Sequence, residues 1–247
     1  MARTGGGATL PYTINSAAGG GNTLLYSGGS VPPAANRLAT SFSAGLLGLG
    51  RPFSVNLTVY FLMQPGSPQR EGSYSDGPTV HFFNGTGGGV SEVTPARAFT
   101  VTGTVAKACT IGGVYTPGAD SATIPVGPTG VVNTTPINKS YASAICNSLT
   151  NLQVTSQSGG VKRAAAAPSG LTHIINYSAA ASYGGASSTL NTATIPTATG
   201  AEAGTVGTTS GATSSGSISV IITPQTCAQP LVKGSYSDTL RITLTPQ

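Results

Sequence analysis

The sequence contains few charged residues. Only 7% of its 247 residues are Asp, Glu, Lys or Arg, against roughly 25% in an average soluble domain. Six acidic residues and two histidines leave little material for a catalytic site, because acid–base and nucleophilic mechanisms depend on such groups. We therefore expect a protein that is not an enzyme and that needs no cofactor.

Patterns of metal, nucleic-acid and membrane binding are also missing. The three cysteines form no Cys-x-x-Cys, so zinc is not indicated. The 11 basic residues are scattered, and the pair Lys162 and Arg163 lacks the aromatic neighbours of a nucleic-acid surface. No run of about 18 apolar residues occurs, so we expect no transmembrane segment. One disulfide and one leftover thiol among Cys109, Cys146 and Cys227 would indicate an oxidising compartment.

Glycine and proline are abundant, with 35 and 17 residues. With Ser, Thr and Asn they disfavour helices and favour turns between short strands. Apolar and polar residues alternate over 99–107, which predicts a half-buried strand. Further strands are expected over 109–111, 141–146, 152–155, 171–177, 217–222 and 238–245, and a surface loop or irregular edge over 194–214. The sequence thus predicts an all-β protein built from sandwiches.

An internal repeat divides the chain. The sequence Gly-Ser-Tyr-Ser-Asp occurs twice, 162 residues apart. Its outer and central residues are Gly72, Tyr74 and Asp76 in the first copy, and Gly234, Tyr236 and Asp238 in the second. An alternating apolar strand follows each copy, which indicates two related units. We predict a first unit over 1–83, a Gly-rich linker over 84–97 and a second unit over 98–247.

The first unit is shorter at its front. Tyr177 lies about 80 residues into the second unit, whereas its counterpart Tyr12 lies about a dozen residues from the start of the chain. We expect roughly 65 to 70 residues to be missing from the first unit, together with its cysteine pair and a signal peptide. Such a partial sandwich should expose a strand edge and an open core, and should be unstable.

The second unit resembles the spore coat protein U domain, which occurs in subunits of archaic chaperone–usher pili. The resemblance covers 99–246. It depends on the strand that leads into Cys109-Thr110-Ile111, on Ala144-Ile145-Cys146-Asn147, and on the turn motif and last strand at 234–244. The first unit is similar to the C-terminal half of that domain but departs from it at Gly77-Pro78, where proline removes a strand donor.

This resemblance implies an immunoglobulin-like, pilin-type sandwich that lacks its last strand. A periplasmic chaperone would supply that strand first, and the N-terminal segment of a neighbouring pilin subunit would replace it at the outer-membrane usher. The resemblance also implies a disulfide between Cys109 and Cys146, with Cys227 outside the family pattern. Asp76 and Asp238 are expected to cap turns. The protein would pass through the periplasm to the cell surface.

Two tandem units of this family imply a tip or minor subunit that accepts a strand and mediates attachment and biofilm formation. Two alternatives stay open. One is a secreted, spore-coat-like structural protein without an adhesive tip role. The other is a carbohydrate-binding surface module, for which Tyr12, Tyr26 and Tyr60 are the candidate aromatic residues.

A leucine-rich run at 44–50 has two interpretations. Leu46, Leu47 and Leu49 stand among glycines and fit neither strand alternation nor a long helix. They form either a buried loop or strand, or an exposed adhesive loop, because exposed apolar loops usually bind a partner. Substitution of Leu46 or Leu47 by Asp would then abolish adhesion without affecting secretion.

Overall fold

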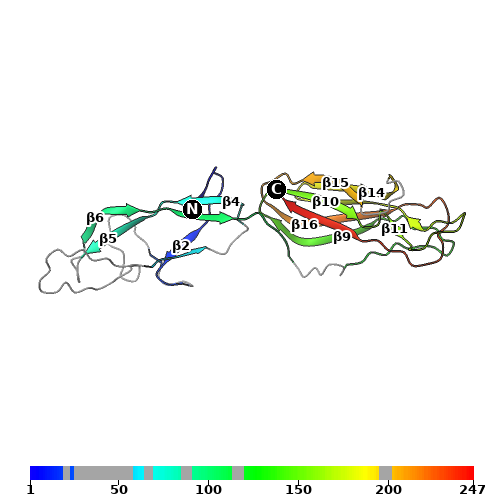
Figure 1. The fold of residues 1–247 in the computed structure, drawn as a ribbon, viewed down its shortest axis with the longest axis horizontal. Coiled ribbons are helices and arrows are strands. Elements are labelled where there is room, and N and C mark those ends of the chain that lie inside the picture. The colour runs from blue at the N-terminus through cyan, green and yellow to red at the C-terminus, as the bar shows by residue number, and fades with distance from the viewer. Residues whose placement is uncertain (19–22, 25–57, 64–68, 85–90, 113–119, 195–201) are drawn as a thin grey trace. The chain divides into compact units, whose positions relative to one another are not determined.

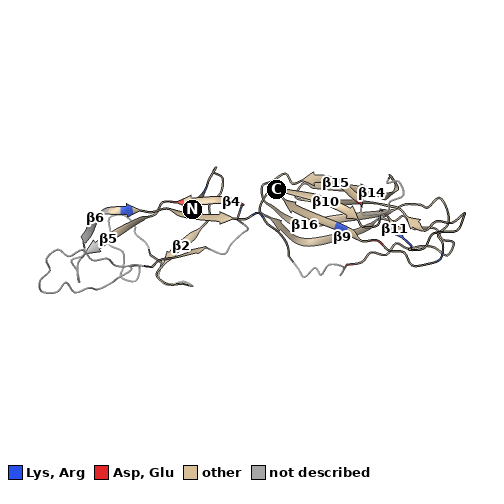
Figure 2. Cartoon of the chain, viewed as in Figure 1, with Lys and Arg blue, Asp and Glu red and all other residues tan. Residues whose placement is uncertain are grey.

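The prediction of an all-β protein is confirmed by a computed structural model. It describes residues 1–18, 23–24, 58–63, 69–84, 91–112, 120–194 and 202–247. The chain divides into two compact units, Met1–Val105 and Ala106–Gln247 (Figure 1). Within the described residues no helix is long and apolar enough to cross a membrane. Charged residues are sparse along both units (Figure 2).

Unit 1 consists of short strands around a small core. The strands are β1 Ala2–Arg3, β2 Tyr12–Asn15, β3 Tyr60–Met63, β4 Gly72–Asp76, β5 Thr79–Asn84, β6 Ser91–Ala98 and β7 Val101–Val105. They pair in the orders β1-β4-β7, β2-β3 and β5-β6. The core contains Met1, Leu10 and Tyr74, against which Val101 and Val105 of β7 pack.

One long antiparallel pair joins β4–β5 to β6–β7 inside unit 1. Gly72 lies opposite Val105, and the same register continues as far as Val80 opposite Arg97. Beyond Val80 the register shifts at an irregularity. The sequence analysis assigned β6 to a linker and β7 to the first strand of the second unit. In the structure both strands belong to unit 1.

Unit 2 contains two larger sheets. Its strands are β8 Cys109–Ile111, β9 Ile137–Cys146, β10 Thr150–Ser156, β11 Val161–Lys162, β12 Ile174–Ile175, β13 Tyr177–Tyr183, β14 Ala186–Asn191, β15 Glu202–Thr208, β16 Ser214–Pro224 and β17 Leu240–Pro246, with a 3₁₀ turn η2 at Thr192–Thr194. One sheet has the order β14-β13-β16-β9-β8 and the other β15-β10-β17, while β11 and β12 form a short pair.

The core of unit 2 lies between these sheets. Burial alternates with period two along β10, β13 and β14, as expected for strands with one face on a core. Leu152 and Val154 of β10 and Tyr177 and Tyr183 of β13 are at most 2% exposed. Small residues separate the large ones, since Ala179 and Ala181 of β13 are also buried.

One side of the sandwich is closed by direct contact between β14 and β15. The Thr189 N–H donates to Thr205 Oγ1 at 2.9 Å, and Ser188 Oγ donates to the Thr205 carbonyl. Gly204 and Gly207 permit this approach, because a Cβ at either would collide with the backbone of β14. The sequence analysis placed a loop or irregular edge here and missed β15.

Candidate functional site

The last strand of unit 2, β17, has inward-facing side chains that are only half-buried. Leu240, Ile242 and Leu244 pack against the core. Val154 of β10 lies opposite Ile242 in the register and has 0% of its surface exposed. β10 has a strand on both sides, whereas β17 is an end strand of its sheet. The apolar row of β17 is therefore left partly uncovered on its outer side.

The outer edge of β17 also presents backbone groups that pair with no strand in the part of the chain that the structure describes. Successive residues of an antiparallel strand direct their N–H and C=O groups alternately toward and away from a given neighbour. The Gln157 N–H donates to the Thr239 carbonyl (2.9 Å), and the Gln247 N–H donates to the Leu149 carbonyl (2.7 Å). Odd-numbered residues of this segment thus bond to β10. We call the outward row on Leu240, Ile242 and Leu244 the open edge.

The same edge exists in unit 1, where another strand covers it. The Thr4 N–H donates to the Ser73 carbonyl (2.8 Å), so odd-numbered residues of β4 face β1. The Phe99 N–H donates to the Pro78 carbonyl (3.1 Å), so even-numbered residues face β6–β7. We call this even-numbered row over 72–80 the covered edge.

Because the repeat offset of 162 residues is even, Leu240 and Ile242 of the open edge correspond to Pro78 and Val80 of the covered edge. In unit 2 Ser237, which corresponds to Ser75, exchanges backbone hydrogen bonds of 3.0 and 3.1 Å with Lys162. Ser75 lies opposite Ala2 of β1 in the same way. The expectation that unit 1 exposes a strand edge is thus wrong at the covered edge, because β6–β7 pairs with it.

The repeated motif makes the same tyrosine–aspartate contact in both units. Tyr12 O–H donates to Asp76 Oδ2, and Tyr177 O–H donates to Asp238 Oδ2, both at 2.6 Å. Asp76 also accepts a bond from the Gly77 N–H (2.8 Å). In the same way Asp238 accepts from the next N–H along the chain (2.7 Å). The residues around Gly72 were described from sequence as a turn, but they form strand β4.

The central tyrosine of the motif is anchored in the same way in both copies. Tyr74 O–H donates to the Arg70 carbonyl, and Tyr236 O–H donates to the Val232 carbonyl, each at 2.6 Å. Tyr74 is 1% exposed beneath β7, whereas Tyr236 is half-buried. The tyrosine contact of the two motifs therefore matches, while the cover differs.

β9 carries a polar cluster that faces the same way as its half-buried residues. Lys139 Nζ donates to Asp120 Oδ1 (2.8 Å), and Tyr141 O–H donates to Asp120 Oδ2 (2.7 Å). These bonds, that from Lys139 first, hold the pKa of the Asp120 carboxyl below its usual value. Tyr141 also packs against the core of unit 2.

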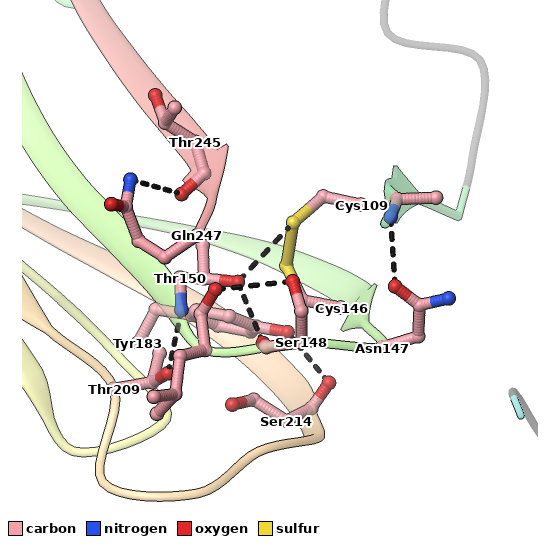
Figure 3. Close-up of a disulfide and its surroundings, with 12 residues drawn as sticks. Cys109, Cys146, Asn147, Ser148, Thr150, Tyr183, Thr209, Ser214, Thr245 and Gln247 are labelled. Carbon is pink, nitrogen blue, oxygen red and sulfur yellow. Dashed lines mark hydrogen bonds between the residues drawn. A yellow bond between two sulfur atoms is a disulfide. The ribbon is translucent and has the colours of Figure 1, made fainter. Parts of the chain in front are cut away.

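The C-terminal ends of β9 and β17 meet at the disulfide. Cys109 and Cys146 are bonded, which confirms the pairing implied by the resemblance. Thr150, which lies opposite Pro246 of β17, has its Oγ1 3.5 Å from Cys109 Sγ. Figure 3 shows Thr245 of the last strand, and Gln247 just after that strand, beside this group. The disulfide thus joins the paired strands β8 and β9 of the five-stranded sheet, close to the end of β17.

Asn147, next to the disulfide, forms hydrogen bonds with the first residues of unit 2. Its Nδ2 donates to the Ala106 carbonyl (2.8 Å), and its Oδ1 accepts from the Ala108 N–H (2.7 Å). The Asn147 N–H donates to the Ala108 carbonyl (3.1 Å). Asn147 itself is 8% exposed, whereas Ala106 and Ala108 are exposed.

The other candidate residues are not brought to one site. Cys227 is a half-buried free thiol whose Sγ lies 3.5 Å from the Ile174 carbonyl, and burial raises its pKa. Tyr12 is engaged by Asp76 and packs against Phe61 (5.8 Å between ring centroids), while Tyr60 is 37% exposed. No cluster of metal-ligating residues occurs in the described part of the chain. Tyr26, Leu46, Leu47 and Leu49 lie outside the described residues.

The sequence predicted the last strand of unit 2, but it could not show which backbone groups of that strand face outward. The alternation at Leu240, Ile242 and Leu244 was visible in the sequence, whereas the direction of their backbone groups depends on register. Comparison with models of protein families, with curated proteins and with solved structures found no match to the chain.

Proposed function

We propose that the chain is a subunit of a surface pilus assembled by a chaperone and an usher, and that unit 2 is completed by a strand from another polypeptide. In this proposal both units are immunoglobulin-like, and the protein acts in attachment and biofilm formation as a tip or minor subunit. The periplasmic chaperone covers the open edge first, and a neighbouring pilin subunit covers it after passage through the outer-membrane usher.

A single observation carries the proposal: equivalent edges in the two units differ in cover. In unit 1 the strand pair β6–β7 lies on the covered edge. In unit 2 no strand among the described residues pairs with the open edge. The chain therefore contains an example of the pairing that the proposal requires in trans.

The physical gain from such a strand has two parts. Backbone groups at the open edge would exchange water for strand partners, which gives a row of main-chain hydrogen bonds. The half-buried side chains of Leu240, Ile242 and Leu244 would lose their remaining exposed surface, at roughly 25 cal/mol per Å² of apolar area. The Cys109–Cys146 disulfide supports assembly in an oxidising compartment.

A strand fused to the C-terminus tests the proposal. A copy of residues 91–107, which includes the counterparts of the whole pair β6–β7, would be added after Gln247 of the full chain through a flexible linker. We expect the fused protein to be monomeric and to unfold at a higher temperature than the unmodified chain. The control carries Asp at the half-buried positions 99, 101, 103 and 105 of the fused copy. This control protein should gain no stability over the unmodified chain.

Hydrogen exchange would measure the protection of each backbone amide of β17 in the same two proteins. In the unmodified chain, the amides of Leu240, Ile242 and Leu244 should exchange much faster than those of Arg241, Thr243 and Thr245. The fused strand should slow the first set to the rate of the second. Equal protection of both sets in an unmodified, monomeric chain would show that the edge is already closed and would reject the proposal.

A further inference from the structure

Unit 1 has an ion pair beside the repeated motif. Arg3 lies opposite Tyr74 in the strand pair β1–β4. Its Nη2 donates to Glu71 Oε1 (2.9 Å), and its Nε donates to the Glu71 carbonyl (2.7 Å). The two side chains are 17% and 23% exposed. One arginine thus binds both the carboxylate and the backbone carbonyl of a single glutamate.

Unit 2 has an arginine in the same place. A Cβ added to Gly72 would lie 2.6 Å from Arg3 Nε, and one added to Gly234 would lie 2.6 Å from Arg163 Nε. Each arginine side chain therefore lies against the first glycine of its motif, where any larger residue would displace it. Arg163 is half-buried in this position.

The glutamate of this ion pair is replaced by lysine in unit 2. The repeat offset of 162 that aligns Tyr74 with Tyr236 also aligns Glu71 with Lys233. Lys233 is exposed. A neutral pair of charges in unit 1 is therefore matched in unit 2 by two cations, Arg163 and Lys233.

The residue paired with this arginine also differs between the units. The Arg3 N–H donates to the Ala8 carbonyl, and the Arg163 N–H donates to the His173 carbonyl, both at 3.0 Å. Directly opposed residues of an antiparallel pair have their side chains on the same face. The imidazole of His173 thus lies on the same face as Arg163, so this change adds a possible hydrogen-bond donor and no carboxylate.

No acidic residue of unit 2 takes the place of the missing glutamate. The acidic residues of unit 2 are Asp120, Glu202 and Asp238. Asp120 and Asp238 already accept hydrogen bonds from other side chains. Among the residues that the structure describes, none of the three forms an ion pair with Arg163 or Lys233. The arginine is therefore positioned as in unit 1 but lacks the anion that it binds there.

From this difference we infer that Arg163 and Lys233 form a binding site for a carboxylate, supplied by an acidic segment of a partner protein. A glutamate of that segment takes the place of Glu71, and Arg163 binds its carboxylate and its backbone carbonyl as Arg3 does. Arginine suits such a contact at two points, because its N–H groups are held in a rigid fork. A sugar acid offers the carboxylate without a peptide carbonyl, so a protein segment matches the contact of unit 1 more closely.

The site lies outside the open edge as defined above, and the inference does not depend on how that edge is covered. Titration of the full chain with a glutamate peptide tests it. The probe is acetyl-Gly-Glu-Gly-Glu-Gly-amide, and the control peptide has glutamine in place of glutamate. The backbone amide resonances of Arg163 and Gly234 would report binding at low ionic strength, where charge pairs are least screened.

We expect the glutamate peptide to shift these two resonances, with a Kd at least about tenfold lower than that of the glutamine peptide, which corresponds to 1.4 kcal/mol. The absence of a shift, or equal binding of both peptides, would overturn the site.

A charge reversal in the chain separates this site from the effect of net charge. Lys233→Glu restores the residue of unit 1 and gives Arg163 a partner within its own chain. This variant should bind the glutamate peptide at least about tenfold more weakly, while its midpoint of urea unfolding should not fall. Lys107→Glu is the matched control, because it makes the same charge change at another exposed position of unit 2.

The control variant should alter Kd by less than about twofold. An equal loss of binding in Lys107→Glu and Lys233→Glu would show that the peptide responds to net charge, and it would overturn the inference.

Digalacturonate distinguishes a protein segment from an acidic polysaccharide. Like the peptide it carries two carboxylates, but it has no peptide carbonyl. We expect its Kd to be at least about threefold higher than that of the glutamate peptide. Equal or tighter binding of digalacturonate that is lost in Lys233→Glu would assign the site to an acidic glycan and reject a protein partner.

Discussion

Tyr177 and Asp238 are joined by a hydrogen bond of 2.6 Å between the inner sheet strand β13 and the segment that leads into β17. Tyr177 is 2% exposed, and its pKa is raised by burial and then by the Asp238 carboxylate. Ser156 Oγ (2.6 Å) and the Ser158 N–H (2.9 Å) donate to the same carboxylate. The contact therefore ties three segments of unit 2 together where its last strand begins.

Replacement of Tyr177 by Phe should destabilise unit 2 by about 1.5 to 3 kcal/mol, because a hydrogen bond to a charged group is lost inside the sandwich. Urea unfolding followed by circular dichroism would measure the change. The matched variant is Tyr12→Phe in unit 1, where the equivalent aspartate is exposed. That variant should cost less, and an equal or larger cost would contradict the importance of burial.

Unit 1 should lose stability in acid through Asp76. The hydrogen bond from Tyr12, followed by that from Gly77, lowers the pKa of Asp76 from 3.8. Because the folded state holds the ionised form, this contribution is present above the unfolded pKa and is lost as the pH falls through the folded pKa. Urea midpoints between pH 5 and pH 2 would show this dependence, and Asp76→Asn should flatten it.

The contact between Tyr12 and Asp76 also predicts that unit 1 loses stability at high pH. Burial and Asp76 raise the pKa of Tyr12 from 10.0 to about 12. A raised pKa means that the contribution is complete below pH 10 and is lost as the pH rises toward 12. Tyrosine absorbance titration of the chain and of Tyr12→Phe would isolate this group. Ionisation of Tyr12 at its ordinary pKa would contradict the contact with Asp76.

Removal of the disulfide should destabilise unit 2 strongly. The bond spans a sequence separation of 37 residues, and constraint of the unfolded chain over such a loop is worth about 3 to 4 kcal/mol. The variant with both Cys109→Ser and Cys146→Ser would be compared with the native chain by urea unfolding. Cys227→Ser is the control, and it should leave the midpoint nearly unchanged.

Asn147 provides a further test beside the disulfide. Asn147→Ala removes both side-chain bonds and leaves the Ala106 carbonyl and the Ala108 N–H without these partners, so we expect a loss of about 2 to 3 kcal/mol. Asn133→Ala is the matched control, because Asn133 makes a similar bond to the Thr135 N–H (2.9 Å) in an exposed loop. Thermal unfolding of the two variants would separate the effects.

The closed side of the sandwich should be intolerant of side chains at its glycines. In Gly207→Ala the new Cβ would collide with the Ser187 backbone, and we expect a loss of roughly 2 kcal/mol or more. Gly127→Ala, where the Cβ would lie 3.6 Å from the Val131 carbonyl, should be nearly neutral. Similar midpoints for both variants would argue against the close approach of β14 and β15.

Most strands with alternating apolar residues could be predicted from the sequence. β7, β9, β10, β16 and β17 each overlap a predicted strand, because their inward residues are large and regularly spaced. β15 was missed since its inward positions include glycine, which fits the close contact with β14 but reads as loop. The hairpin of β13 and β14 was also missed, because small residues, Ala179, Ala181, Ala186 and Ser188, occupy several of its buried positions.

Strand β6 was not predicted from the sequence. Its segment follows a Gly-rich run and contains Pro95, so it reads as a linker. In the structure Pro95 falls where the register between β5 and β6 shifts, the kind of place at which a strand tolerates proline. The sequence analysis also assigned Phe99 and the residues after it to the second unit, whereas residues up to Val105 belong to unit 1. Alternation identifies a strand but not the sheet that it joins.

The covering pair β6–β7 has a consequence for growth of a fibre. A linear polymer lengthens only when each monomer brings both a donating and a receiving end. Residues 91–105 are already committed within their own chain, whereas unit 2 offers a vacant receiving end. If the open edge is the joint, residues 91–105 are not available as a donating end, and growth past this molecule would need a donating strand from elsewhere.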